Sequence, residues 1–286
     1  MTDKQNSKEW IGKSATDYGF VSAYSANYFS LTLDRKDPPF EEGDLLPPAW
    51  HYFYFHELVA LAETGVDGHR EKGDFMPPLP FPRRMWAGSK MSFESPICIG
   101  EKVRKVVTID DIIVKEGKSG TLCFVTTVEE IFGEDDRRTT IEKRTQVYRD
   151  APQNKDESPP LIPAPAEPLW SRIICPSPVL LFRYSALTMN SHRIHYDRDY
   201  VSKVEGYPGL LVHGPLTMTL MLDLFRREKP LAEIKSFDLR AVAPVYDTMD
   251  FSVHGAAGKS EGQCKLWAMT GEGGLAMDAN VKFAVD

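Results

Sequence analysis

The feature of this sequence that most constrains its fold is an internal duplication. Residues 150–168 are proline-rich and acidic, and they show no helix or strand periodicity. We therefore predict an extended linker at 150–168, which separates an N-terminal half at 1–149 from a C-terminal half at 169–286. With 286 residues in total, each half is long enough to form a folded unit.

The two halves match in order at three places. The matched pairs are 28–34 with 184–190, 46–51 with 209–214, and 93–100 with 240–247. Runs rich in Val, Ile, Thr and Phe then follow in both halves, and they predict antiparallel strands at 102–113, 121–132 and 139–148, and at 249–254, 262–270 and 276–285. The repeat predicts that each half consists of one buried helix followed by a meandering sheet.

The predicted helices begin after His51 in the first half and at Gly214 in the second. Pro215 suits the first turn of a helix, and the residues that follow it are apolar around most of the helix girth. We expect the sheet of each half to wrap around such a helix.

Composition excludes several classes of protein. The chain carries 34 Lys and Arg against 41 Asp and Glu, a net charge of −7, so neither nucleic acid nor an anionic membrane is an expected partner. The four isolated cysteines and the polar first ten residues favour reduced thiols and a cytoplasmic location over the mitochondrial matrix.

The two copies differ in their insertions. The second copy gains a loop at 191–197 that reads Ser-His-Arg-Ile-His-Tyr-Asp, whereas the first gains an Arg-, Pro- and Trp-rich insertion that includes 65–88. We expect one site, with its chemistry supplied by the second copy and substrate binding by the first. His192 and His195, together with Asp197, could in principle bind a metal. A third well-placed ligand and a closed geometry are not evident, so no metal is expected.

Residues 184–197, YSALTMNSHRIHYD, resemble the signature of the MaoC-like (R)-specific enoyl-CoA hydratases. Residues 46–55, 65–69 and the string PRRMWAG at 82–88 are similar to a subgroup that includes mesaconyl-C4-CoA hydratase, itaconyl-CoA hydratase and the mitochondrial 3-hydroxyacyl-thioester dehydratases. The resemblance implies an α+β double hot-dog fold, in which two tandem antiparallel sheets each wrap a central helix. This internal pseudo-dimer leaves open whether two chains form a homodimer.

The resemblance also implies roles for individual residues. His195 matches the catalytic histidine, and Gly214 matches the glycine whose N–H faces the thioester oxygen. Asn190 replaces the usual catalytic aspartate; a carboxamide can position a water but cannot take its proton. An imidazole and a helix N-terminus are chemically suited to hydrating an enoyl thioester.

The implied reaction is the reversible hydration of an enoyl-CoA, with no cofactor because coenzyme A is part of the substrate. Arg193 is the first candidate to bind a carboxylate on the acyl group, which favours itaconyl-CoA or mesaconyl-C4-CoA. The full set of expected substrate contacts is Arg193, Arg83, Arg84, Trp86, Tyr184, Arg183, His213 and Arg240. The alternatives are a general 3-hydroxyacyl-thioester dehydratase of fatty acid metabolism, a hot-dog thioesterase and a non-catalytic acyl-CoA-binding protein.

Overall fold

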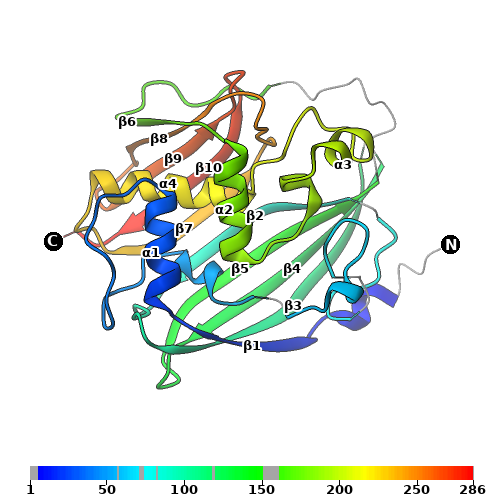
Figure 1. Cartoon of the computed structure of the whole chain (residues 1–286), viewed down its shortest axis with the longest axis horizontal. Helices are drawn as coiled ribbons and strands as arrows, with labels where there is room; N and C mark the ends of the chain where they lie inside the picture. The colour runs from blue at the N-terminus through cyan, green and yellow to red at the C-terminus, as the bar shows by residue number, and fades with distance from the viewer. Residues whose placement is uncertain are drawn as a thin grey trace.

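A single antiparallel sheet organises the molecule (Figure 1). The computed structural model describes residues 6–56, 58–70, 74–81, 83–117, 120–150 and 161–285. Within this part the sheet has ten strands in the order β1-β3-β4-β5-β2-β7-β10-β9-β8-β6. Their bounds are β1 Ser14–Phe20, β2 Arg83–Phe93, β3 Lys102–Gly117, β4 Gly120–Phe132, β5 Arg138–Arg149, β6 Trp170–Ile174, β7 Ile234–Ala241, β8 Phe251–Ala257, β9 Gln263–Met269 and β10 Leu275–Phe283.

The strand order reflects the duplication. Strands β1–β5 form one side of the sheet and β6–β10 the other, and β2 pairs with β7 where they meet. A Cβ on Gly88 would lie 2.4 Å from the Leu239 carbonyl oxygen, so glycine permits the close approach of the strands there. The two sheets expected from the resemblance are therefore one continuous sheet. The boundaries at 149 and 168 stay a prediction.

All six predicted strands are confirmed as β3, β4, β5, β8, β9 and β10, with ends that differ by a few residues. Four other strands, β1, β2, β6 and β7, were not predicted. The β2 strand lies partly inside the segment interpreted as an insertion. It was missed because its Arg-, Trp- and Gly-containing sequence lacks a strict alternation of polar and apolar residues.

The buried helix of the second half is confirmed as α4, Gly214–Glu228. Every residue from Leu216 to Phe225 is buried, including the polar Asp223, and the helix packs against β6, β8 and β9. Its first residue, Gly214, precedes Pro215, whose missing N–H costs nothing in the first turn.

The buried helix predicted after His51 is wrong. Residues Trp50–Phe53 form only the short 3-10 helix η2, and the described residues between it and β2 contain only one more, η3, Leu61–Glu63. The segment uses its aromatic side chains as core instead, since Phe29 packs on Trp50 and Phe53 with ring centroids 4.8 and 4.0 Å apart. Aromatic residues lose side-chain freedom in helices, which favours this arrangement.

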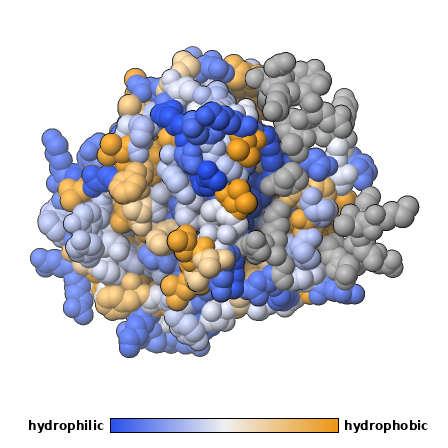
Figure 2. All heavy atoms as spheres, turned by 45° about the vertical axis from the view of Figure 1, so that its right-hand side comes forward, coloured by the Kyte–Doolittle hydropathy of each residue, from blue (hydrophilic) through white to orange (hydrophobic). Residues whose placement is uncertain are grey.

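Most of the remaining helices lie over one face of the sheet (Figure 1). The first pair is α1, Ala23–Thr32, and α2, Pro178–Thr188, which contact each other and contain most of the first matched segment of each half. The others are η1 Asn6–Trp10, η4 Arg193–His195 and α3 Arg198–Lys203. No described helix is both long and apolar enough to cross a membrane. Figure 2 shows small hydrophobic groups among hydrophilic residues on the face that it presents.

Candidate active site

His195 lies at the end of η4 and is buried. Its Nδ1 is 2.7 Å from the carbonyl oxygen of Leu211, and since a carbonyl only accepts, Nδ1 must carry the proton. Burial lowers the pKa of His195 to about 4, although the bond to Leu211 acts in the opposite direction. The imidazole is therefore neutral near pH 7, and Nε2 offers a lone pair that can accept a proton.

His213 and Tyr184 form the packing layer behind His195. The His213 ring stacks on His195 with centroids 3.7 Å apart, and its Nε2 lies 2.8 Å from the Ser185 hydroxyl. Tyr184 packs on His213 and also against Phe29, and its exposed fraction is only 1%. Of these two expected substrate contacts, His213 thus lies directly against the His195 ring and Tyr184 supports His213 from behind.

The N-terminus of α4 provides the second part of the site. Gly214 is the first residue of the helix, where N–H groups lack partners within the helix and the dipole favours negative charge. The ring of Trp86 covers this point so closely that a Cβ on Gly214 would lie 2.7 Å from Trp86 Cε3. The fold therefore brings Trp86 from the first half onto the helix N-terminus of the second.

Asn190 follows the C-terminal end of α2. Its Oδ1 accepts a hydrogen bond from the His192 N–H at 3.1 Å, and its own N–H donates to the Ser185 carbonyl. No described residue accepts a hydrogen bond from the Asn190 Nδ2, so this amide NH2 group can still donate to a water. The side chain thus has a turn-forming role and keeps donors free for the positioning role, which stays a prediction.

Two segments far apart in sequence meet beside His195. The turn at 65–70 contacts the loop at 191–193 through the bond from the Arg193 N–H to the Asp67 carbonyl, 2.9 Å long. Gly68 is required here, because a Cβ at this position would lie 2.1 Å from the Ser191 carbonyl oxygen. The first half thus contributes directly to the loop that carries His195.

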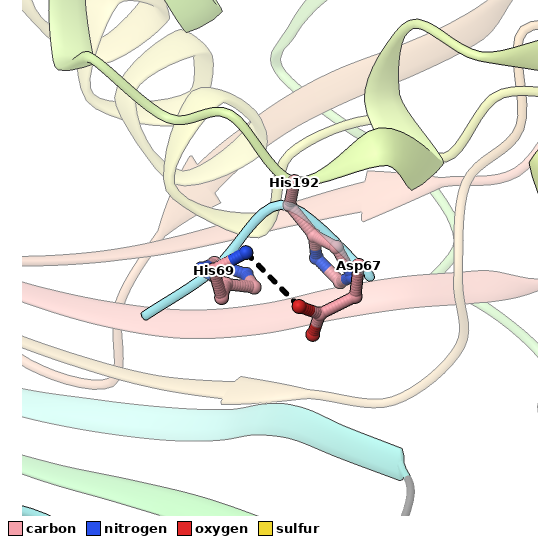
Figure 3. Close-up of side chains that lie close together, drawn as sticks. All are labelled: Asp67, His69 and His192. Carbon is pink, nitrogen blue, oxygen red and sulfur yellow. Dashed lines mark hydrogen bonds between the residues drawn. The ribbon is translucent and has the colours of Figure 1, made fainter. Parts of the chain in front are cut away.

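This contact creates a cluster of Asp67, His69 and His192 (Figure 3). The potential ligand atoms of the three residues all lie within 4.8 Å of one another, and the Asp67 carboxylate accepts from the His69 backbone N–H. The His192 ring stands at 90° to His195, with centroids 5.6 Å apart. Asp67 and His69 stood in the sequence within the motif Gly-Val-Asp-Gly-His, but the contact of this motif with His192 was not predicted.

The charge around the cluster opposes a metal ion. Burial lowers the pKa of His69 and lowers the pKa of His192 to about 3, and in both cases the positive charge of Arg84 adds to the effect. A carboxylate and two neutral imidazoles could coordinate a divalent cation, but the same Arg84 would repel it.

Most of the arginines predicted to bind substrate have protein partners. Arg193, the first candidate for a carboxylate, donates to Asp197 through Nε and Nη2 and to the Val66 carbonyl through Nη1, so the expected free receptor is not found. Arg83 donates to the Glu205 carbonyl. Arg183 joins α2 to α1 through Thr32, and Arg240 is exposed on β7.

Comparison with known proteins agrees with this geometry. The family model for hydroxyacyl-thioester dehydratase type 2 matches residues 49–247. The chain is 36% identical over 273 residues to the mesaconyl-C(4)-CoA hydratase of Chloroflexus aurantiacus, covering 96% of both chains.

Solved structures support the same fold. A MaoC-like dehydratase superposes with a TM-score of 0.73 at 14% identity, covering 98% of this chain and 99% of that one. A Mycobacterium tuberculosis protein described as a double hotdog fold gives a TM-score of 0.60 at 12% identity, covering 96% of each chain. The chain therefore belongs to the hydroxyacyl-thioester dehydratase type 2 family, whose members are MaoC-like hydro-lyases with a double hot-dog fold.

Proposed function

We propose that this hydro-lyase hydrates a short, branched, dicarboxylic enoyl-CoA, namely itaconyl-CoA or mesaconyl-C4-CoA, to a citramalyl-CoA-type product. The observation that carries the chemistry is a neutral, buried His195 whose ring stacks on His213, the residue directly before the α4 N-terminus. The choice of acyl group is supported by the 36% identity to a mesaconyl-C(4)-CoA hydratase.

The proposed reaction begins with water next to His195. In mesaconyl-C4-CoA, whose double bond is conjugated with the thioester, Nε2 accepts a proton from the water as its oxygen bonds to the β-carbon, and the electrons of the carbon–carbon double bond shift towards the thioester oxygen. The N–H of Gly214 and the positive end of the α4 dipole stabilise the resulting enolate. The protonated His195 then donates its proton to the α-carbon, which completes the 3-hydroxyacyl product and restores the neutral imidazole.

Asn190 assists without taking part in proton transfer. Its Nδ2 donates to the water oxygen and directs a lone pair at the β-carbon, while Oδ1 stays in the turn with the His192 N–H. Stabilisation by the N–H of Gly214 requires the thioester to enter beside Trp86, which covers the N-terminus of α4.

A direct assay tests this function. Initial rates are measured at a series of substrate concentrations, by the loss of ultraviolet absorbance of the conjugated enoyl thioester for crotonyl- and mesaconyl-C4-CoA and by chromatographic detection of the hydrated product for itaconyl-CoA. We expect the two dicarboxylic esters to have the higher kcat/KM. Equal or faster turnover of crotonyl-CoA would overturn the dicarboxylate assignment in favour of a general 3-hydroxyacyl-thioester dehydratase, and release of free CoA thiol would indicate a thioesterase.

A further inference from the structure

We propose that Arg144 on β5, rather than Arg193, binds the distal carboxylate of the acyl group. This inference rests on the proposed function and identifies the residue that would select its substrate. It begins from an unusual feature of the interior: a largely buried guanidinium whose hydrogen-bonding capacity is unused.

Arginine carries five N–H donors, and buried polar groups are almost always hydrogen-bonded. In the described part of the chain, the Arg144 side chain makes no hydrogen bond, and its Nε is fully buried without a partner. Its nearest ion-pair contact joins Nη1 to Glu129 Oε1 over 3.7 Å, which is too long for a hydrogen bond. Arg193, by contrast, makes three hydrogen bonds. The Arg144 side chain is therefore prepared for an acceptor that the protein does not supply.

The two neighbouring carboxylates do not fill this role. Glu142 is fully buried, and its oxygens accept from the Tyr52 hydroxyl at 2.7 and 2.6 Å and also from the Ser89 hydroxyl. Burial, followed by repulsion from Glu142, raises the pKa of Glu129, which weakens it as a counter-charge. Both carboxylates are near enough to balance the charge of Arg144, but neither accepts a hydrogen bond from its guanidinium.

Arg144 is also near the reacting end of the site. Its guanidinium carbon lies 5.6 Å from the Trp86 ring centroid and 5.5 Å from that of Tyr52. The same Trp86 ring touches Gly214, so a single indole separates Arg144 from the proposed oxyanion site. A C4 or C5 acyl chain places its carboxylate only a few bonds beyond the thioester, whereas the phosphates of coenzyme A lie at the far end of the pantetheine arm.

The fold leaves part of the Arg144 side chain exposed. Arg144 lies on β5 opposite Ser89 on β2, in the half of the sheet that lacks the predicted second buried helix. Although crowded by neighbours, its side chain retains 21% exposure. Flat rings on two sides and a fork of donors suit a planar carboxylate, which can accept two parallel hydrogen bonds.

Substitution of Arg144 tests the inference. A shielded contact between arginine and a carboxylate corresponds to about a 10- to 150-fold preference. We expect Arg144→Gln to lower kcat/KM for mesaconyl-C4- and itaconyl-CoA by about this factor and to change that for crotonyl-CoA far less. Arg144→Lys keeps the charge but loses the fork, so it should retain part of the preference.

Lys143→Gln provides the matched control. Lys143 is the next residue on β5, pairs with Asp110 and is exposed, so its loss removes the same charge from the other face of the strand and should leave the preference unchanged. If Arg144→Gln does not fold, the ratio of kcat/KM between dicarboxylic and monocarboxylic substrates is measured in Arg144→Lys instead. Competitive inhibition of the wild type is measured alongside, and succinyl-CoA should inhibit more strongly than butyryl-CoA.

The outcomes separate the two proposals. If the wild type prefers crotonyl-CoA, the dicarboxylate function itself fails. If the wild type prefers the dicarboxylic esters but Arg144→Gln affects all three substrates equally, or none of them, the function stands and the role of Arg144 is overturned. If only Arg144→Lys folds, a preference equal to that of the wild type overturns the role in the same way.

Discussion

Acid should destabilise this protein strongly because four histidines at the site are kept neutral by burial. They are His69, His192, His195 and His213, and each has a lowered pKa whose largest cause is desolvation. In the unfolded chain, histidine titrates with a pKa of about 6.5. As the pH falls below that value, the unfolded state binds protons that the folded state refuses, so stability is lost.

The size of the effect follows from the number of protons. Each histidine contributes about 1.4 kcal/mol per pH unit, and four together contribute about 5 kcal/mol per unit once the pH is well below 6.5. The full slope should hold down to about pH 4, where the folded His195 itself begins to take a proton. Since a typical domain has a stability of about 5–15 kcal/mol, unfolding is expected near pH 5.

Urea unfolding at a series of pH values between 7 and 5, followed by circular dichroism, measures this slope. His69→Gln removes one of the four groups and should reduce the slope by about a quarter, whatever its effect on stability at pH 7. A free energy of unfolding that does not change between pH 7 and 5 would show that these side chains are exposed or already protonated, and the description of His195 as a neutral imidazole would have to be abandoned.

Three further predictions concern the reaction. His195→Ala should lower kcat by about 10²- to 10⁴-fold with a smaller change in KM, and a correctly folded variant that keeps most of its turnover would exclude His195 as the base. Gly214→Ala should also reduce kcat, because its Cβ would push the Trp86 ring away from the α4 N-terminus; unchanged kinetics would exclude that close contact. Removal of divalent metals with EDTA should leave the initial rate unaltered, because Arg84 opposes a cation at His69 and His192; loss of activity that zinc restores would contradict this.

The sequence predicted the parts of the fold that have a strong local signal. The long strands β3, β4 and β5 are rich in β-branched residues, and α4 combines a Gly-Pro start with an apolar body. The helix expected after His51 failed because the same aromatic residues that suggest a buried helix can pack equally well as a cluster around Phe29. The local sequence does not distinguish these two arrangements.

For the candidate site, local motifs singled out His195, Gly214 and Asn190, whose roles stay predictions, but could not identify partners that are distant in the chain. The loop position of Arg193 suggested a free cation, yet its charge is balanced by Asp197, one helical turn away. Arg144 lies within an ordinary strand pattern, and only the unused donors in the folded structure distinguish it. Its significance depends on neighbours from β2 and η2, which periodicity does not bring together.

The pairing of β2 with β7 determines how this enzyme can be divided. A chain cut within residues 150–168 would give two fragments, each with a newly exposed strand edge whose backbone donors and acceptors are unpaired. Such fragments would tend to associate with each other or with copies of themselves rather than remain as folded monomers. Mixing the two fragments should therefore restore activity, whereas each expressed alone should aggregate, and tags or fusion partners are better attached at the chain ends than between the repeats.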